Sequence, residues 1–339
     1  MSASGTTSDQ RTKLRVGTRS SKLALIQTEY AIEQLTKHHP ELQVDVATMK
    51  TIGDKIQDIA MSKIGDKGLF TKELEAALET GEIDFVVHSA KDMPTQLADN
   101  MELAAVMERV DPRDAVVMSL KNKDKKGLDE LPSGSVVGTG SVRRVSQLRR
   151  LYPHLEFMDI RGNLNTRMAK LDAEDSPYAA LVLAVAGMQR LGAQTRITQT
   201  LDNVLHAVGQ GALGIEARAD DVHMKQLVAK SLGHRPTWLA CLAERQLMRA
   251  LEGGCSVPIG VRTQWSNEGS TLSLQAIVAS PDGAEAVEAD ASAAFASGAD
   301  ASAADACAVD LGARVAALMR ERGASKILNA IHPPEPNAN

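Results

Sequence analysis

Short apolar segments alternate with amphipathic helical segments along most of the chain, and this alternation is the strongest constraint on its fold. Strand-like runs occupy residues 14–17, 42–49, 83–87, 135–137 and 180–185. Apolar residues at helical spacing mark residues 20–35 and 69–78 as helices. The pattern predicts α/β domains with mostly parallel sheets. Because ligands of such sheets bind beyond the carboxyl ends of the strands, we expect functional side chains there.

Length and composition narrow the class of protein. A chain of 339 residues exceeds one comfortable core, so several domains are expected. A net charge of −5 and only 3% aromatic residues give no basis for binding nucleic acid or anionic membranes. Three cysteines without paired spacing indicate a reducing compartment, and the polar residues 1–13 lack the apolar core of a signal peptide. These features predict a cytoplasmic protein.

Several stretches have the composition of connections between elements. Residues 50–68 lack periodicity and are expected to form a long mobile loop, and residues 280–304 are expected to form a low-complexity surface. The two ends, 1–13 and 332–339, are expected to be disordered. Residues 84–91 and 180–187 resemble each other weakly, as two related α/β lobes would require.

The densest positive feature lies between residues 138 and 167. Ser141 is expected to cap a helix whose first turn holds Arg143 and Arg144, where cations oppose the helix dipole. A bound anion at that helix end would offset the unfavourable interaction. Arg161 and Arg167 follow the next strand-like run. Four arginines past strand ends predict a site for a ligand with several carboxylates or phosphates, although a solvated face is the simpler alternative for any one of them.

Asp92 follows the strand-like run 83–87, between Lys91 and Met93-Pro94. A carboxylate among cations stays ionised at neutral pH, because opposite charges lower its pKa. It could therefore stabilise a developing cation, or accept and return a proton. Standing alone, Asp92 would be interpreted as an ordinary turn residue.

Cys255 lies in the segment Glu-Gly-Gly-Cys-Ser-Val-Pro, whose glycines and proline favour a turn. A thiol in a turn can point outward and carry a covalent group, although a loop cysteine without a role is the simpler interpretation. Cys241 and Cys307 lie in helical stretches and are expected to be buried apolar residues.

Two tempting motifs fail. Residues 209–214 match G-x-G-x-x-G, but no strand precedes them and no acidic residue follows near position 233, so we expect close backbone packing or a hinge. The eight histidines show no metal-ligand spacing, so no metal site is predicted.

Seven motifs occur in one order: VGTRSSKLALIQT, KIGDKGLFTKELE, VVHSAKDMPT, VGTGSVRR, IRGNLNTR, AVGQGALGIE and LEGGCSVPIG. On these motifs the chain resembles the porphobilinogen deaminase (hydroxymethylbilane synthase) family from Leu14 to about Leu328. Their wording is closer to eukaryotic, fungal members than to bacterial ones. One departure is Gly140, where many members have serine.

The resemblance implies a fold of three domains. Two lobes like those of periplasmic binding proteins, with mostly parallel sheets, would flank a cleft, and a smaller α/β domain would carry the cofactor cysteine. The implied division is 14–110 plus 211–229, then 114–207, then 235–330. The return of the chain to its first lobe comes from the family and not from any pattern in the sequence.

The resemblance also implies an activity. Four porphobilinogen molecules would be joined head to tail with loss of ammonia, giving the hydroxymethylbilane of heme biosynthesis. The product would grow on a dipyrromethane cofactor held by a thioether to Cys255, and Asp92 would be the catalytic residue. The implied cofactor-binding residues are Lys91, Thr139, Ser141, Arg143, Arg144, Arg161 and Arg190. Substrate would be held by Arg19, Ser21, Gln27 and Arg167, and the mobile loop would include or border Lys63, Lys67 and Phe70. Nothing requires a protein partner, and a monomer is expected.

Two other functions stay open on the residues alone. A cysteine-nucleophile hydrolase for anionic substrates would need a histidine within reach of Cys255. A sensor that captures an anion between two lobes would be indifferent to the substitution Asp92→Ala. The full set of arginines together with Glu-Gly-Gly-Cys favours the deaminase over both.

Overall fold

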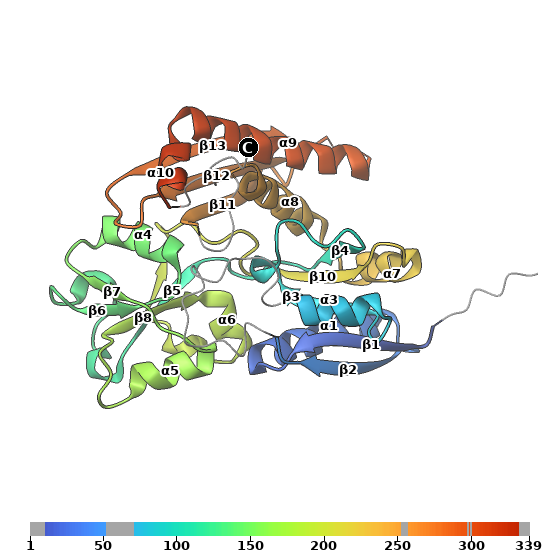
Figure 1. Cartoon of the computed structure of the whole chain (residues 1–339), viewed down its shortest axis with the longest axis horizontal. Coiled ribbons are helices and arrows are strands. Elements are labelled where there is room, and N and C mark those ends of the chain that lie inside the picture. The colour runs from blue at the N-terminus through green and yellow to red at the C-terminus, as the bar shows by residue number, and fades with distance from the viewer. Residues whose placement is uncertain (1–10, 52–70, 252–256, 297, 299, 332–339) are drawn as a thin grey trace, which may run out of the picture.

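The computed structural model describes residues 11–51, 71–251, 257–296, 298 and 300–331. These residues form two five-stranded sheets and a three-stranded antiparallel sheet, with helices packed on each (Figure 1). In each five-stranded sheet four strands run in one direction and the fifth runs against them. The predicted α/β class, with two lobes whose sheets are mostly parallel, is confirmed.

The first sheet has the order β2-β1-β3-β10-β4. Its strands are β1 (Lys13–Arg19), β2 (Gln43–Met49), β3 (Phe85–Ser89), β4 (Met101–Val106) and β10 (Leu213–Arg218). Helices α1 (Lys22–His38) and α7 (Val222–Leu232) bury their apolar residues in one cluster with the strands, and α3 (Lys72–Glu79) contributes to a second cluster. The strand β10 reaches this sheet only after the chain has formed the second one.

The second sheet repeats this arrangement in the order β7-β6-β8-β5-β9. Its strands are β5 (Asp114–Met118), β6 (Val136–Gly138), β7 (Glu156–Met158), β8 (Ala180–Ala184) and β9 (Gln199–Leu201). Its helices are α4 (Val142–Leu151), α5 (Leu164–Asp172) and α6 (Val185–Arg190). The two segments that resemble each other in sequence contain β3 and β8, which occupy the same central place in their sheets.

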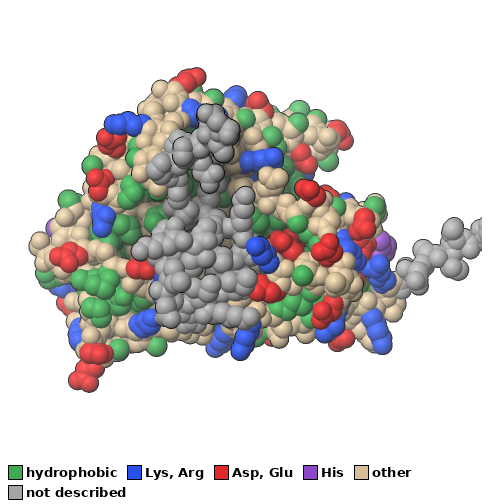
Figure 2. Space-filling view, viewed as in Figure 1, with side chains coloured by type: hydrophobic (Ala, Val, Ile, Leu, Met, Phe, Trp, Pro, Cys, Tyr) green, Lys and Arg blue, Asp and Glu red, His purple; other side chains and the backbone are tan. Residues whose placement is uncertain are grey.

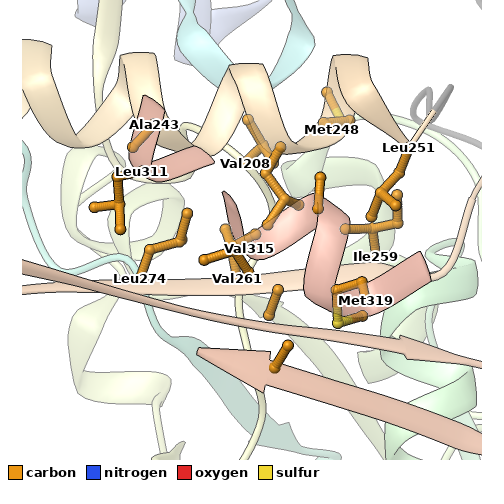
Figure 3. Close-up of a cluster of buried hydrophobic side chains, with 14 of the residues drawn as sticks. Val208, Ala243, Met248, Leu251, Ile259, Val261, Leu274, Leu311, Val315 and Met319 are labelled. Atoms are coloured by element: carbon orange, nitrogen blue, oxygen red, sulfur yellow. The ribbon is translucent and has the colours of Figure 1, made fainter. Parts of the chain in front are cut away.

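The third part packs helices on an antiparallel sheet. It contains α8 (Arg235–Ala250), β11 (Ile259–Ser266), β12 (Thr271–Ala279), β13 (Ala286–Ala294), α9 (Ala301–Glu321) and α10 (Ala324–Ile331). Figure 3 shows its core, where Ala243 of α8 and Leu311 of α9 lie beside Leu274 and Val261 of the sheet. The two helices approach closely because Gly312 has no side chain, and a Cβ there would lie 2.2 Å from the carbonyl oxygen of Ala243.

The expectation of a low-complexity surface over residues 280–304 is wrong. Residues 280–304 contain β13, and Ala289 and Ala293 of this strand are buried in the third core. Alanine is small enough to serve on either face of a sheet, so the strand shows no clear alternation. At the other end, Arg11 to Lys13 are ordered: β1 begins at Lys13, and Arg11 forms an ion pair with Asp221 at 2.9 Å. Residues 1–10, 332–339 and most of the expected mobile loop lie outside the described residues.

A buried carboxylate joins the third part to the two segments that connect the five-stranded sheets. One segment runs from β4 to β5 and contains Arg109, and the other runs from β9 to β10 and contains Gly209. Glu244 of α8 accepts hydrogen bonds from the Nη1 and Nη2 atoms of Arg109 at 2.7 and 2.8 Å. It also accepts bonds from the backbone N–H of Gly209 at 2.8 Å and from Oγ1 of Thr263 at 2.6 Å. Burial by itself would raise the pKa of Glu244, but the attraction of Arg109 outweighs burial and brings this pKa to about 2.

The glycines at 209 and 211 serve close packing, as one of the two sequence interpretations proposed. Both have positive φ, which favours glycine. A Cβ at Gly211 would lie 2.5 Å from the carbonyl oxygen of Val110, and one at Gly209 would lie 3.1 Å from the carbonyl carbon of Ala90. The segment that leads into β10, with Gly209 and Gly211, therefore packs directly against Val110 in the segment after β4 and against the turn after β3.

The surface carries charges of both signs. Figure 2 shows basic and acidic side chains interspersed over the face in view, in keeping with the small net charge of −5. Within the described ranges, none of the helices combines the length and the apolar character needed to cross a membrane.

Replacing Glu244 by Gln should lower the free energy of unfolding by about 3–5 kcal/mol, because the buried guanidinium of Arg109 would lose its compensating charge. The control is Asp310→Asn, which removes an exposed helical pair with Arg314 and should cost about 0.3–0.5 kcal/mol. Urea denaturation followed by circular dichroism measures both. Equal losses in the two variants would contradict the assignment of Glu244 as a structural link.

The free energy of unfolding should also fall on mild acidification, because His206 is buried in its neutral form. Burial lowers the pKa of His206 from 6.5 to about 4, so between these values the unfolded chain binds a proton that the folded chain does not. This share of stability is complete above about pH 7 and is lost as the pH falls toward 4. His206→Gln should therefore lose less stability between pH 7 and pH 5 than the parent protein, whereas the exposed His223→Gln control should match the parent. A parent-like pH slope in His206→Gln would refute this explanation.

Candidate active site

The residues selected from the sequence gather where strand ends of the two five-stranded sheets face each other. Arg19 ends β1, Lys91 and Asp92 follow β3, and Thr139 and Ser141 follow β6. Helices α1 and α6 adjoin here, since a Cβ added at position 187 of α6 would lie 3.8 Å from the side chain at position 23 of α1. The site therefore draws on the carboxyl ends of parallel strands from both lobes, as expected for such folds.

Asp92 ends a short 3₁₀ turn, Ala90–Asp92, that is fixed by its neighbours. The backbone N–H of Ala90 donates to the carbonyl of Ala212 at 3.0 Å, which ties the turn to the start of β10. Ala90 and Met93 are buried, whereas Lys91 and Asp92 are half-buried. The turn thus holds its two charged side chains at the edge of the site while its apolar side chains anchor it.

Lys91 experiences both burial and the charges of the opposite lobe. Burial lowers the pKa of Lys91 from 10.5 to about 8, the charge of Asp92 opposes this change, and Arg144 adds to it. Because Arg144 belongs to α4, its influence on Lys91 shows that the side chains of the two lobes lie within electrostatic reach of each other.

Arg143 and Arg144 share a buried partner that the sequence analysis missed. Asp114, the first residue of β5, accepts hydrogen bonds from Nη1 of Arg143 at 2.7 Å and from Nη2 of Arg144 at 2.8 Å. Gln210 donates a further bond to it at 2.8 Å. Burial would raise the pKa of Asp114, but the two guanidinium groups hold it far below its usual range. A carboxylate opening the apolar run Asp-Ala-Val-Val-Met was the signal available in the sequence.

The cations of the site are incompletely neutralised. The Nε atoms of Arg143 and Arg144 are buried and have no hydrogen-bond partner in the structure. Burial lowers the pKa of Arg167, and the positive charges of Arg144 and Arg161 lower it further. Burial and neighbouring cations both disfavour the charged form of Arg167, and an anionic ligand bound beside these groups would relieve this effect.

The other predicted arginines have partners that use only part of their donor capacity. Arg161 donates from Nε to Asp159 at 2.6 Å, and Arg167 donates from Nε to a backbone carbonyl at 2.8 Å. Arg190, whose pKa burial lowers to about 10, donates from Nη2 to the carbonyl of Gly211 at 2.8 Å. A guanidinium has five N–H donors, so these contacts are compatible with a further ligand.

The turn after β6 forms as the sequence predicted. Ser141 caps α4 by accepting the backbone N–H of Arg144 at 3.4 Å, and Thr139 accepts the N–H of Ser141 at 3.3 Å. Gly140 lies close to the Asp159 side chain: a Cβ at position 140 would lie 2.9 Å from Oδ1 of Asp159. The glycine therefore leaves room for the carboxylate that pairs with Arg161.

Two of the predicted substrate residues make internal contacts. Ser21 caps α1 by accepting the N–H of Ala24 at 3.3 Å. The buried amide of Gln27 donates to Oγ of Ser89 at 2.9 Å, which joins α1 to the end of β3. Arg19 is half-buried. The remaining predicted site residues lie outside the described residues: Cys255, Lys63, Lys67 and Phe70.

The cofactor that the resemblance implies fits the described side chains. A dipyrromethane carries several carboxylates, and the site offers unpaired buried N–H groups among cations that raise the local potential. Among residues 11–51, 71–251, 257–296, 298 and 300–331, no group of histidine, cysteine, aspartate and glutamate side chains could hold a metal ion.

Comparison with solved structures returns matches of low similarity. The VFT2 domain of BvgS from Bordetella pertussis aligns with a TM-score of 0.38 and 15% identity, covering 65% of this chain and 87% of that domain. The probable amino-acid-binding protein YtmK from Bacillus subtilis aligns with a TM-score of 0.36 and 14% identity, covering 65% and 97%. Likeness at this level adds nothing to the fold described above.

Comparison with known sequences is decisive. Two family models match: "Porphobilinogen deaminase, dipyromethane cofactor binding domain" over residues 14–226 and "Porphobilinogen deaminase, C-terminal domain" over residues 238–321. Porphobilinogen deaminase from Nostoc is 51% identical over 326 residues, covering 96% of both chains. The enzyme from the fungus Eremothecium gossypii is 48% identical over 328 residues, covering 95% and 98%. Both family models and relatives of nearly full coverage agree, and the chain therefore belongs to the porphobilinogen deaminase family.

Proposed function

We propose that the chain joins four porphobilinogen molecules head to tail, with loss of ammonia, and releases the linear tetrapyrrole hydroxymethylbilane. This is the hydroxymethylbilane synthase activity of its family, a transferase activity of tetrapyrrole and heme biosynthesis. The observation that carries the proposal is the pair of buried guanidinium groups of Arg143 and Arg144, whose Nε atoms have no hydrogen-bond partner and which share one carboxylate, Asp114.

The proposed cofactor is a dipyrromethane bound by a thioether to Cys255. In the sequence Cys255 lies between Leu251 and Val257, which are both buried in the third core. When bound, the cofactor supplies the pyrrole carbon to which the first substrate is joined. The residues of this chain hold its carboxylates and those of the growing product.

Arginine and lysine side chains are proposed to bind these carboxylates. The cofactor set is Lys91, Thr139, Ser141, Arg143, Arg144, Arg161 and Arg190, and the substrate set is Arg19, Ser21, Gln27 and Arg167. Hydrogen bonds to charged groups contribute about 1.5–3 kcal/mol each, so several of them can hold a polyanion firmly. The unpaired Nε atoms of Arg143 and Arg144 support their place in the first set.

Asp92 is proposed to stabilise the positive charge that develops on the substrate pyrrole as ammonia leaves, and to accept and return a proton. At about 4 Å and an effective dielectric constant near 20, the attraction is about 4 kcal/mol. The charge of Asp92 affects the pKa of both Lys91 and Arg167. The carboxylate thus lies among the groups that are proposed to hold the reacting molecules.

The proposal extends to the organisation of the protein. The division into 14–110 plus 211–229, 114–207 and 235–330 follows the three sheets, since β10 pairs with β3 and β4. Lys63, Lys67 and Phe70 would act from the loop before α3. The enzyme is proposed to work as a cytoplasmic monomer without a protein or nucleic-acid partner.

Asp92→Asn should retain the cofactor and bind substrate, but its turnover should fall about a thousand-fold, because about 4 kcal/mol of charge stabilisation is lost. Steady-state formation of hydroxymethylbilane measures the effect. The control is Asp99→Asn, which removes an exposed carboxylate from the same connection. Turnover of Asp92→Asn equal to that of the control would exclude a catalytic role for Asp92 and favour a simple anion-binding protein.

Cys255→Ser should lack the covalent cofactor. Intact mass of the denatured protein should show an excess of two linked pyrrole units in the parent and in Cys307→Ser, and no excess in Cys255→Ser. Purified protein without the excess should acquire it on incubation with porphobilinogen. If the parent never gains this mass, the thioether assignment is wrong and the cysteine hydrolase returns as the alternative.

A further inference from the structure

Helix α8 contacts the segment that follows Asp92. Arg245 of α8 donates from Nη2 to the carbonyl oxygens of Pro94 at 2.7 Å and Thr95 at 3.2 Å. One helical turn earlier, the buried Cys241 packs in a small apolar cluster with Ala90, which begins the Asp92 turn. Two positions of α8, four residues apart, therefore contact the chain on either side of Asp92.

The segment after Asp92 depends on donors from outside itself. Met93 leaves the 3₁₀ turn with an extended backbone, and Pro94 has no N–H to donate. Neither Pro94 nor Thr95 belongs to a strand or a helix, so regular pairing does not fix them. Asp92 consequently lies between two anchors: the bond from Ala90 to Ala212 before it, and the bonds from Arg245 after it.

Packing alone does not explain an arginine at position 245. Burial lowers its pKa, although the charges of Cys241 and Glu216 oppose the change. Its hydrogen-bond acceptors among the described residues are neutral carbonyls, and none of the carboxylates described pairs with it. A desolvated cation without a paired anion costs free energy that a methionine of similar length would avoid. Nη2 of Arg245 donates to both carbonyls, whereas a methionine has no N–H to donate to either of them.

The same helix leads to the proposed cofactor attachment. α8 ends at Ala250, and Cys255 follows five residues later in the sequence. Glu244 fixes α8 against both segments that connect the five-stranded sheets, through Arg109 and Gly209. Any bond between α8 and the Asp92 segment therefore sets the position of the carboxylate relative to the helix that precedes the cysteine.

We propose that Arg245 is a positioning residue for the family reaction. Its two hydrogen bonds to Pro94 and Thr95 fix the position of Asp92 relative to α8, and so relative to the cofactor attached beyond α8. Arg245 itself does not contact the reacting atoms. The inference rests on the proposed roles of Asp92 and Cys255. It adds that the third domain both carries the cofactor and aligns the catalytic carboxylate of the first lobe.

The test compares Arg245→Met and Arg245→Lys with Arg314→Met. Arg314 is a matched control, because it is an exposed arginine of the third part that also donates to a backbone carbonyl, far from Asp92 in the sequence. Intact mass gives the cofactor-loaded fraction, kcat is expressed per loaded molecule, and thermal unfolding is measured separately. Displacement of a catalytic group by about 1 Å can slow a reaction about 100-fold.

Arg245→Met should lower kcat about 10- to 100-fold with KM changed less than about two-fold, because substrate binding is left intact while Asp92 is displaced. Arg245→Lys should recover part of kcat, since an ammonium can donate to the same carbonyls but sits on a side chain of different length and shape. Arg314→Met should keep the parent kcat. A purely structural role would lower the unfolding temperature of Arg245→Met without changing kcat per loaded molecule.

A kcat of Arg245→Met equal to that of Arg314→Met, or a change confined to KM, would overturn the inference. If Arg245→Met does not fold, Arg245→Lys decides: because lysine places its donor nitrogen differently, its kcat must fall below that of Arg314→Lys. Asp92→Asn separates the two levels of the argument. Slow Asp92→Asn with normal Arg245 variants removes the positioning role alone, whereas normal turnover in Asp92→Asn removes the proposed mechanism with it.

Discussion

The ion pairs between Asp114 and the two arginines of α4 are the interaction on which the site depends. Without this carboxylate, two guanidinium groups would be buried side by side in the first turn of a helix, where the helix dipole also opposes them. Asp114 makes their burial possible because each of its oxygens binds one arginine. It neutralises only one of the two charges, so the pair keeps a net positive charge. The site is thereby built in advance for an anion.

Glu244 also forms a buried ion pair with arginine, but this pair has a different role. Asp114 holds side chains within the second lobe, whereas Glu244 joins the third part to the segments that connect the lobes. Breaking either pair would leave a buried charge without compensation. The difference lies in the remaining charge: Arg109 and Glu244 balance each other, but the cluster around Asp114 does not balance. The balanced pair suits a structural joint, and the unbalanced cluster suits a binding site.

Local patterns predicted the local features of this protein. The strand ends, the cap at Ser141 and the glycine packing near Gly211 follow from neighbouring residues, and the structure contains each of them. The roles of Asp114 and Glu244 were not predicted, because their partners lie about 30 and 135 residues away in the chain. Residue spacing carries no signal at such separations. The strand β13 was not predicted, because alanine fits either face of a sheet and gives no clear alternation. The return of the chain to its first lobe, seen as β10 in the first sheet, was foreseen only through the family resemblance.

The positive potential of the site also links cofactor loading to folding. Arg167, Arg143 and Lys91 all have lowered pKa values, which means that the folded protein destabilises their charged forms. Carboxylates bound among them would reverse that effect, and a ligand that binds only the folded state stabilises it in proportion to its affinity. The same desolvated cations that lower the stability of the folded protein would therefore favour the binding of a polyanion. Attachment through a covalent bond would keep that stabilisation through every turnover.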